Sequence, residues 1–280
     1  WPEIKEVAHW QTKGWARAVK YDGERLFVAE GKAGMTIWDV TAKAKSVLMT
    51  RQEGDVNELS GPFTGFIVQS NGTHTVTVSD ISKPASPVKV LSFQTPHYLS
   101  QFLDDCLFAD RYFCLAHGKG AEIIDLKTMR RLEDIFPVPP DKHIPVGLGP
   151  LKQKLIVIDG INARCHMEVY DMGNSLSPQQ IARKMIPGIN AGRVTVAGNI
   201  LYMANAANGT IGVVDISDIG KPDVRKNIQT LGNCRKVIVG RKGIVVPDGY
   251  GGLLVSDSES ASDLPIRMDE MREQYFAQYF

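Results

Sequence analysis

Six short apolar runs, each ending in an aspartate, recur along the chain at nearly even spacing. The runs are MTIWD, VTVSD, AEIID, MEVYD, IGVVD and LLVSD, and they end at Asp39, Asp80, Asp125, Asp171, Asp215 and Asp257. Successive aspartates are separated by 41, 45, 46, 44 and 42 residues. Self-similarity at a period of about 40 to 45 residues is typical of the four-stranded blades of a propeller. Two unrelated β-sandwiches would not place the same residue at so regular an interval.

Each aspartate run belongs to a longer pattern that predicts four strands per repeat. Two apolar runs precede it, such as ARAVKYDG and RLFVAEGKAG in the first repeat, and their turns are rich in Gly and Asn. Such turns suit β-hairpins, because Gly and Asn tolerate positive φ. A fourth run follows the aspartate and often begins near proline, as in KPASPVKVLSF, which an edge strand tolerates. The sequence therefore predicts an all-β fold, a six-bladed β-propeller over residues 1–268.

The two ends of the chain leave the closure of the last blade open. WPEIKEVA at residues 1 to 8 and LPIRMDE at residues 264 to 270 are both suited to its fourth strand. Residues 269–280 form a tail in which Met271, Tyr275, Phe276 and Tyr279 fall on one helical stripe. This spacing predicts a short C-terminal helix that packs under the ring or docks onto a partner, including a second copy of the chain.

Charge and hydropathy exclude several classes of partner. The chain carries 32 basic and 31 acidic residues, so no net field favours nucleic acid or an anionic membrane. No apolar run approaches the roughly 20 residues of a transmembrane segment. Four cysteines show no metal-binding or disulfide spacing, and Cys106 and Cys114 are predicted to be buried free thiols. The first residue is Trp1, which fits removal of a signal peptide and hence a periplasmic or extracellular, secreted protein; a trimmed chain would look the same.

The repeat resembles that of the LVIVD-repeat family of β-propellers. The resemblance is carried by FVAEGKAGMTIWDVT, VTVSDISKPASPV, YMANAANGTIGVVDISDIGKP and GGLLVSDS. It implies the propeller fold and is compatible with an exported protein, but it assigns no activity. The repeats at Asp125 and Asp171 depart from the pattern. They read DLKTM and DMGNSL where the pattern has Asp-Ile-Ser followed by a proline.

All six histidines are predicted to lie at one loop face of the propeller. His74, His117 and His166 fall between second and third strands, and His9, His97 and His143 precede first strands. Imidazole side chains on converging loops can bind zinc, copper or iron, and they can also transfer protons near neutral pH. We therefore expect a divalent transition metal on His74, His117 and His166, and catalytic roles for His117, His166 and His143. Other residues expected to bind ligand at this face are His74, His97, Tyr98, Asp55, Asp159, Arg164, Arg193, Arg235 and Trp10.

Two functions remain open from the sequence. The first is a His-rich ligand site around the central channel, which could serve a metal-assisted enzyme that acts on a small anionic substrate. The second is a non-enzymatic extracytoplasmic scaffold that binds another protein, for example as a subunit of a larger redox complex. No nucleophile elbow, phosphate-binding loop or dinucleotide fingerprint is present in the sequence. The repeated aspartates are expected to be structural, each accepting backbone N–H groups in the turn after its strand.

Overall fold

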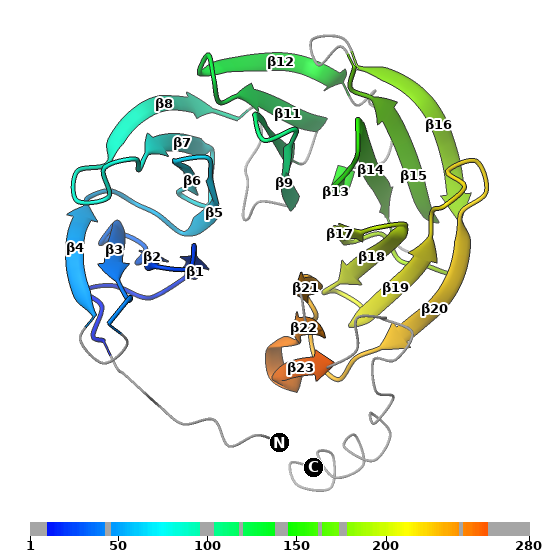
Figure 1. Cartoon of the computed structure of the whole chain (residues 1–280). Coiled ribbons are helices and arrows are strands. Elements are labelled where there is room, and N and C mark those ends of the chain that lie inside the picture. The colour runs from blue at the N-terminus through cyan, green and yellow to red at the C-terminus, as the bar shows by residue number, and fades with distance from the viewer. Residues whose placement is uncertain are drawn as a thin grey trace, which may run out of the picture. The chain divides into compact units, whose positions relative to one another are not determined.

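The structure is a computed structural model that describes residues 10–42, 46–95, 104–117, 120–137, 145–161, 164–173, 178–240 and 243–256. These residues form six antiparallel sheets, and within each sheet the strands lie side by side in chain order (Figure 1). Five sheets have four strands and the last has three. Consecutive four-stranded meanders of this kind are propeller blades. The predicted all-β, six-bladed propeller is therefore confirmed.

The strands have the following bounds. Blade 1 contains β1 (Ala18–Tyr21), β2 (Arg25–Ala29), β3 (Met35–Asp39) and β4 (Val47–Gln52). Blade 2 contains β5 (Glu58–Phe63), β6 (Phe66–Ser70), β7 (Thr75–Asp80) and β8 (Val88–Gln94). Blade 3 contains β9 (Asp104–Phe108), β10 (Tyr112–His117), β11 (Gly120–Asp125) and β12 (Arg130–Pro137).

The remaining blades repeat this order. Blade 4 contains β13 (Pro145–Leu151), β14 (Lys154–Ile161), β15 (Arg164–Asp171) and β16 (Gln179–Ile186). Blade 5 contains β17 (Arg193–Ala197), β18 (Ile200–Asn205), β19 (Thr210–Asp215) and β20 (Asp223–Gln229). Blade 6 contains β21 (Ile238–Gly240), β22 (Gly243–Pro247), the 3-10 turn η2 (Gly249–Gly251) and β23 (Leu253–Ser256). The segments expected to close the last blade, residues 1 to 8 and 264 to 270, and the C-terminal helix lie outside the described residues.

The chain divides into two compact units. The first holds blades 1 and 2 together with residues 110–112 and 124–131 of blade 3. The second holds the rest of blade 3 and blades 4 to 6. Each unit has its own apolar packing. Phe27, Met35 and Ile67 are fully buried in the first, and Ile158 and Met203 in the second.

The repeated aspartates end the third strands and cap the turns that follow. In each of the five described cases, the carboxylate accepts the backbone N–H of the residue two positions later, at 2.8–3.0 Å. The five are Asp39, Asp80, Asp125, Asp171 and Asp215. Such side-chain to backbone bonds are typical of Asx turns. The predicted structural role of these aspartates is therefore confirmed for the described residues.

A β-bulge just before the aspartate recurs in blades 1, 2, 4 and 5. In each of these blades the pairing of the third and fourth strands shifts by one residue. The extra residue lies on the fourth strand, and the four are Met49, Val90, Ile181 and Arg225. A bulge bends its strand and increases the local twist. The fourth strands of four blades thus share the same deformation at the same place in the repeat.

All four cysteines are buried free thiols, as predicted for Cys106 and Cys114. Cys165 lies on β15 with its side chain in an apolar cluster of blades 4 and 5, where Sγ is 3.6 Å from the sulfur of Met203. Burial raises the pKa of the Cys165 thiol to about 12. Cys165 is therefore part of the core and separate in role from its neighbour His166.

Candidate functional site

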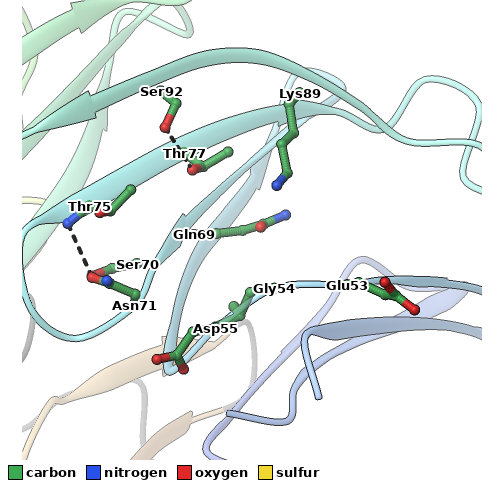
Figure 2. A pocket seen from close by; sticks show the side chains of 11 residues that line it. Glu53, Gly54, Asp55, Gln69, Ser70, Asn71, Thr75, Thr77, Lys89 and Ser92 are labelled. Atoms are coloured by element: carbon green, nitrogen blue, oxygen red, sulfur yellow. Dashed lines mark hydrogen bonds between the residues drawn. The ribbon is translucent and has the colours of Figure 1, made fainter. Parts of the chain in front are cut away.

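A polar pocket of about 220 Å³ lies in the first unit, between the β4–β5 loop and one face of blade 2 (Figure 2). Thr77 and Ser92 form the wall on blade 2, Lys89 lies beside them at the rim, and Gly54 and Asp55 lie opposite. The lining residues are Glu53, Gly54, Asp55, Val56, Gln69, Ser70, Asn71, Thr75, Thr77, Lys89 and Ser92. Val56 is the only apolar side chain among them, so the pocket is suited to hydrogen-bonding ligands.

Backbone and amide hydrogen bonds fix the loop that forms the rim of the pocket. Val56 and Gly31 exchange two backbone hydrogen bonds of 2.8 and 2.9 Å, which attach the loop to blade 1. The Asn57 amide donates to the Asn71 carbonyl at 2.7 Å and to Asp55 Oδ1 at 2.9 Å, which attaches the loop to blade 2. The rim is therefore held from both blades and positions Asp55.

Gln69 forms the buried floor of the pocket. Its side-chain nitrogen donates to Gln52 Oε1 at 2.6 Å and to Ser79 Oγ at 3.2 Å, and it lies 3.7 Å from the sulfur of Met35. These contacts set the orientation of the amide. Within the described part of the chain, no group donates a hydrogen bond to Gln69 Oε1. This side chain is 3% exposed and lines the pocket, so its oxygen is available to a ligand donor.

The equivalent face of blade 1 carries an ion pair where blade 2 carries the pocket. Glu30, directly after β2, accepts hydrogen bonds from Arg51 at 2.7 Å and from the Thr36 hydroxyl at 2.6 Å. Thr36 and Arg51 are directly paired on β3 and β4. Burial raises the pKa of Glu30, but the hydrogen bonds from Arg51 and Thr36 outweigh it and lower the pKa below its usual value. The pair therefore keeps a buried carboxylate charged.

Blade 4 has the same arrangement with a second carboxylate. Arg183 on β16 is paired with Glu168 on β15 and lies 3.2 Å from its carboxylate. Arg183 also lies 3.4 Å from Asp159, which lies within β14 at the position equivalent to Glu30. The Tyr170 hydroxyl donates to Glu168 at 2.5 Å, and burial followed by this bond raises the pKa of Tyr170. Carboxylate and guanidinium groups thus fill this face of blade 4.

Short neutral side chains occupy the corresponding places in blade 2. Thr77 and Ser92, the paired residues of β7 and β8, stand where blade 4 has Glu168 and Arg183. Their hydroxyls lie 3.2 Å apart. Asn71 stands at the end of the second strand, in place of Glu30 and Asp159. The pocket therefore exists because blade 2 lacks the long charged side chains that fill the same space in blades 1 and 4.

Charged residues are confined to the rim of the pocket. Glu53 and Asp55 belong to the loop, and Lys89 extends from β8 (Figure 2). Among the described residues, neither Glu53 nor Lys89 makes a side-chain hydrogen bond or an ion pair. The floor is neutral and the rim carries both signs of charge, so the pocket lacks the basic lining expected for an anionic ligand.

His166 and Asp159 form a second polar site, in blade 4. They face each other on β15 and β14, and His166 Nδ1 lies 3.4 Å from Asp159 Oδ1. The His166 side chain is 22% exposed, whereas that of Asp159 is 5% exposed. A buried carboxylate beside an imidazole can orient it for proton transfer. The sequence placed His166 in a loop, but it lies within β15, because that strand extends to Arg164.

The structure describes only some of the other predicted site residues. His74 lies in the β6–β7 turn of the first unit, and its carbonyl accepts the Thr95 N–H. Arg193 begins β17 and is half-buried, and Arg235 is exposed. The Trp10 ring packs against Trp38, with ring centroids 6.1 Å apart. His117 ends β10 and Arg164 begins β15, but their side chains lie outside the described part, as do His97, Tyr98 and His143 altogether.

Of the predicted site residues that the structure describes, only Asp55 lines the pocket. His74 and His166 belong to different units. Within the residues that the structure describes, no three His, Cys, Asp or Glu side chains are grouped so that they could hold a metal ion. The same part of the chain contains no helix long and apolar enough to cross a bilayer.

A sequence signal for the pocket exists but requires a comparison between blades. The residue three positions before the aspartate is polar in four blades: Thr36, Thr77, Glu122 and Glu168. Side chains of a strand alternate between its two faces, so a polar residue at this position indicates that one face of the blade is polar. The cross-strand partner of this residue on the fourth strand differs in size between blades. Arg51 and Arg183 are long and fill the face, whereas Ser92 is short and leaves it open.

Comparison with known proteins supports the repeat and the fold. The LVIVD repeat model matches residues 13–52, 66–95 and 188–230. Three segments of this chain are thus LVIVD repeats. The second segment includes seven of the eleven pocket-lining residues, and the third covers blade 5. No curated protein matches the chain.

Two solved structures show the same fold at low identity. One is the computationally designed Ika8 protein, with a TM-score of 0.61 and 14% identity over 87% of this chain and 71% of that chain. The other is BamB from Moraxella catarrhalis, with a TM-score of 0.57 and 9% identity over 85% of this chain and 70% of that chain. At these identities the likeness concerns the propeller fold alone.

Proposed function

We propose that this LVIVD-repeat propeller is a binding protein and that its ligand site is the pocket of blade 2. The observation that carries the proposal is the replacement of a partly buried ion pair by Thr77 and Ser92, beside a Gln69 oxygen that no described group satisfies. A propeller face built only for packing would be filled, as it is in blades 1 and 4. A small, preformed pocket with few polar groups is the usual form of a ligand site.

The test is a map of backbone amide shifts in the 15N-labelled protein. The probe is a mixture of glucose, sodium glucuronate, glycine, sodium phosphate and ethanolamine, added to millimolar concentration. We expect shifts confined to residues 53–56, 69–71, 75–77 and 89–92. Shifts that cluster elsewhere, or no shifts at any of these positions, would reject the proposal.

Thr77→Glu combined with Ser92→Arg provides a sharper control, because it rebuilds the ion pair of blade 4 inside the pocket. We expect this variant to keep the fold and to lose the shifts. Thr77→Ser combined with Ser92→Thr keeps both hydroxyls and should retain them. Binding that survives the rebuilt ion pair would place the ligand outside this pocket.

Acid–base chemistry in blade 4 is a second candidate function, favoured by the contact between His166 and Asp159. A screen of carboxylic ester, lactone and phosphoester hydrolysis tests it. Activity should disappear in His166→Gln and remain in Lys184→Gln, a change of an exposed residue on the next strand.

The predicted metal centre on His74, His117 and His166 is tested by elemental analysis of untagged protein. Zinc, copper or iron should disappear in His117→Ala combined with His166→Ala. Absence of stoichiometric metal in the wild type would reject that centre.

A further inference from the structure

We infer that the ligand of the blade 2 pocket is a neutral hydroxyl-bearing ring, the chemistry of a single sugar unit. This inference rests on the proposed function and adds the class of ligand to it.

The floor excludes a charged group at its centre. In blades 1 and 4 the same place holds a carboxylate and a guanidinium in contact. In blade 2 it holds the Thr77 hydroxyl and the exposed Ser92 hydroxyl of the wall, next to the buried Gln69 amide of the floor, and none of these groups carries a charge. A charged group moved onto this floor would lose hydration without gaining a counter-ion. The part of the ligand that reaches the floor is therefore neutral.

The polar groups of the pocket require a ligand that both donates and accepts hydrogen bonds. Gln69 Oε1 can only accept, and the Asp55 and Glu53 carboxylates can only accept when ionised. Lys89 can only donate, whereas Thr77 and Ser92 can do either. A hydroxyl group donates one hydrogen bond and accepts others, so a ring with several hydroxyls can form hydrogen bonds with all of these side chains. A metal ion would match the carboxylates but would be repelled by Lys89.

Size and shape limit the ligand to one small unit. The pocket volume of about 220 Å³ lies below the roughly 300–1,000 Å³ of pockets that enclose drug-sized ligands. None of the described lining residues is aromatic, so a bound ring gains little stacking energy from them. We therefore expect weak binding of a single ring, with dissociation constants in the millimolar range, typical of small ligands with few non-hydrogen atoms.

Isothermal titration calorimetry of the full chain tests the ligand class. The neutral probes are glucose, galactose and N-acetylglucosamine, and the charged probes are sodium glucuronate, glucosamine and glycine. We expect at least one neutral sugar to bind at least tenfold more tightly than every charged probe. Its binding should weaken at least tenfold in Thr77→Glu combined with Ser92→Arg, and stay within about twofold in Thr77→Ser combined with Ser92→Thr.

The outcomes separate the ligand class from the function of the pocket. A charged probe that binds more tightly than the sugars, and is lost in the rebuilt ion-pair variant, would overturn the sugar inference and keep the proposed function. If no probe of any class binds, or if sugar binding survives the rebuilt ion pair, both are overturned. A bound sugar ring can belong to a polymer or to a free or terminal sugar, and maltotriose and chitotriose distinguish these two sources. Tighter binding of a trisaccharide indicates a polymer, and equal binding indicates a free or terminal sugar.

Discussion

The ammonium group of Lys236 lies 2.6 Å from the carboxylate of Asp104, a residue 132 positions earlier in the chain. The second carboxylate oxygen of Asp104 accepts the backbone N–H groups of Leu148 on β13, at 2.9 Å, and Val194 on β17, at 2.7 Å. One buried side chain on β9 therefore joins the first strands of blades 3, 4 and 5 to the residue that leads into β21. Burial lowers the pKa of Lys236, but the charges of Asp104 and Asp105 outweigh it and raise the pKa.

Asp104→Leu is expected to lower the free energy of unfolding by about 3–5 kcal/mol. The substitution leaves two backbone N–H groups and a largely buried ammonium without their acceptor, and such losses are among the most costly single changes. Asp104→Asn should cost less, because its amide oxygen still accepts hydrogen bonds. Guanidinium denaturation monitored by circular dichroism measures both.

The exposed pair of Asp223 and Arg225 supplies the control for Asp104. Its two side chains are more than half exposed, so Asp223→Asn should change stability by less than about 1 kcal/mol. Equal losses for Asp104→Leu and Asp223→Asn would show that Asp104 does not hold the second unit together.

Stability should fall as the pH drops below about 4, in part through Asp125. The hydrogen bonds from Arg111, followed by that from Thr128, hold the pKa of Asp125 well below its usual range of about 3.9. A carboxyl whose pKa is depressed by folding stabilises the fold above its unfolded pKa, and that contribution is lost as the pH falls towards the folded pKa. Asp125→Asn should therefore be less stable at pH 7 but lose less stability between pH 5 and pH 3.

Urea denaturation at pH 7, 5 and 3 provides that comparison. Glu24→Gln is a suitable control, because Glu24 is an exposed residue and its side chain has no described hydrogen bond. Parallel pH profiles of the wild type and Asp125→Asn would contradict the role assigned to the Arg111 contact.

The cysteine thiols should be unreactive in the folded protein. All four are buried, and burial raises the pKa of Cys165 to about 12 and that of Cys234 to about 11. Because the thiolate is the reactive species, Ellman's reagent at pH 8 should label no thiol until the chain is unfolded, and then four. Rapid labelling of even one thiol in the native protein would show that a cysteine is accessible.

Gly192→Ala is expected to destabilise the second unit by several kcal/mol. A Cβ at this position would overlap the backbone carbonyl of Ala204, so the backbone between blade 5 strands would have to move. Gly198→Ala is the matched control: its Cβ meets nothing within 4 Å, and its φ of 60° costs about 1 kcal/mol. Similar melting temperatures for the two variants would show that the close approach at Gly192 is easily relieved.

The fold could be predicted because its determinants are local and repeated. The alternation of apolar and polar residues defines each strand, and Asp39, Asp80 and their equivalents mark every turn by the same hydrogen bond. The β-bulges could not be predicted, because a bulge is a property of pairing between two strands and leaves no fixed residue in either. Three of the four extra residues, Met49, Val90 and Ile181, are apolar, but Arg225 is charged, so no single residue type marks the bulge.

The pocket of blade 2 was not predicted from the sequence. The predicted site was built on histidines, because their chemistry is distinctive, but among the predicted residues that the structure describes only Asp55 lines the pocket. Thr77 and Ser92 are unremarkable in a single strand. Their role becomes apparent only when they are known to be paired across two strands, and when this pair is compared with Glu168 and Arg183 at the same place in blade 4.

The shared bulge has a practical consequence for engineering. In blades 1, 2, 4 and 5 the fourth strand begins eight residues after the aspartate, at Val47, Val88, Gln179 and Asp223, although the connecting sequences differ. In blade 3 it begins five residues after Asp125, at Arg130. We therefore expect that a connection together with its fourth strand can be exchanged among these four blades. Transplanting one of these segments into blade 3 would lengthen the connection between its third and fourth strands by three residues, so blade 3 requires its own shorter connection.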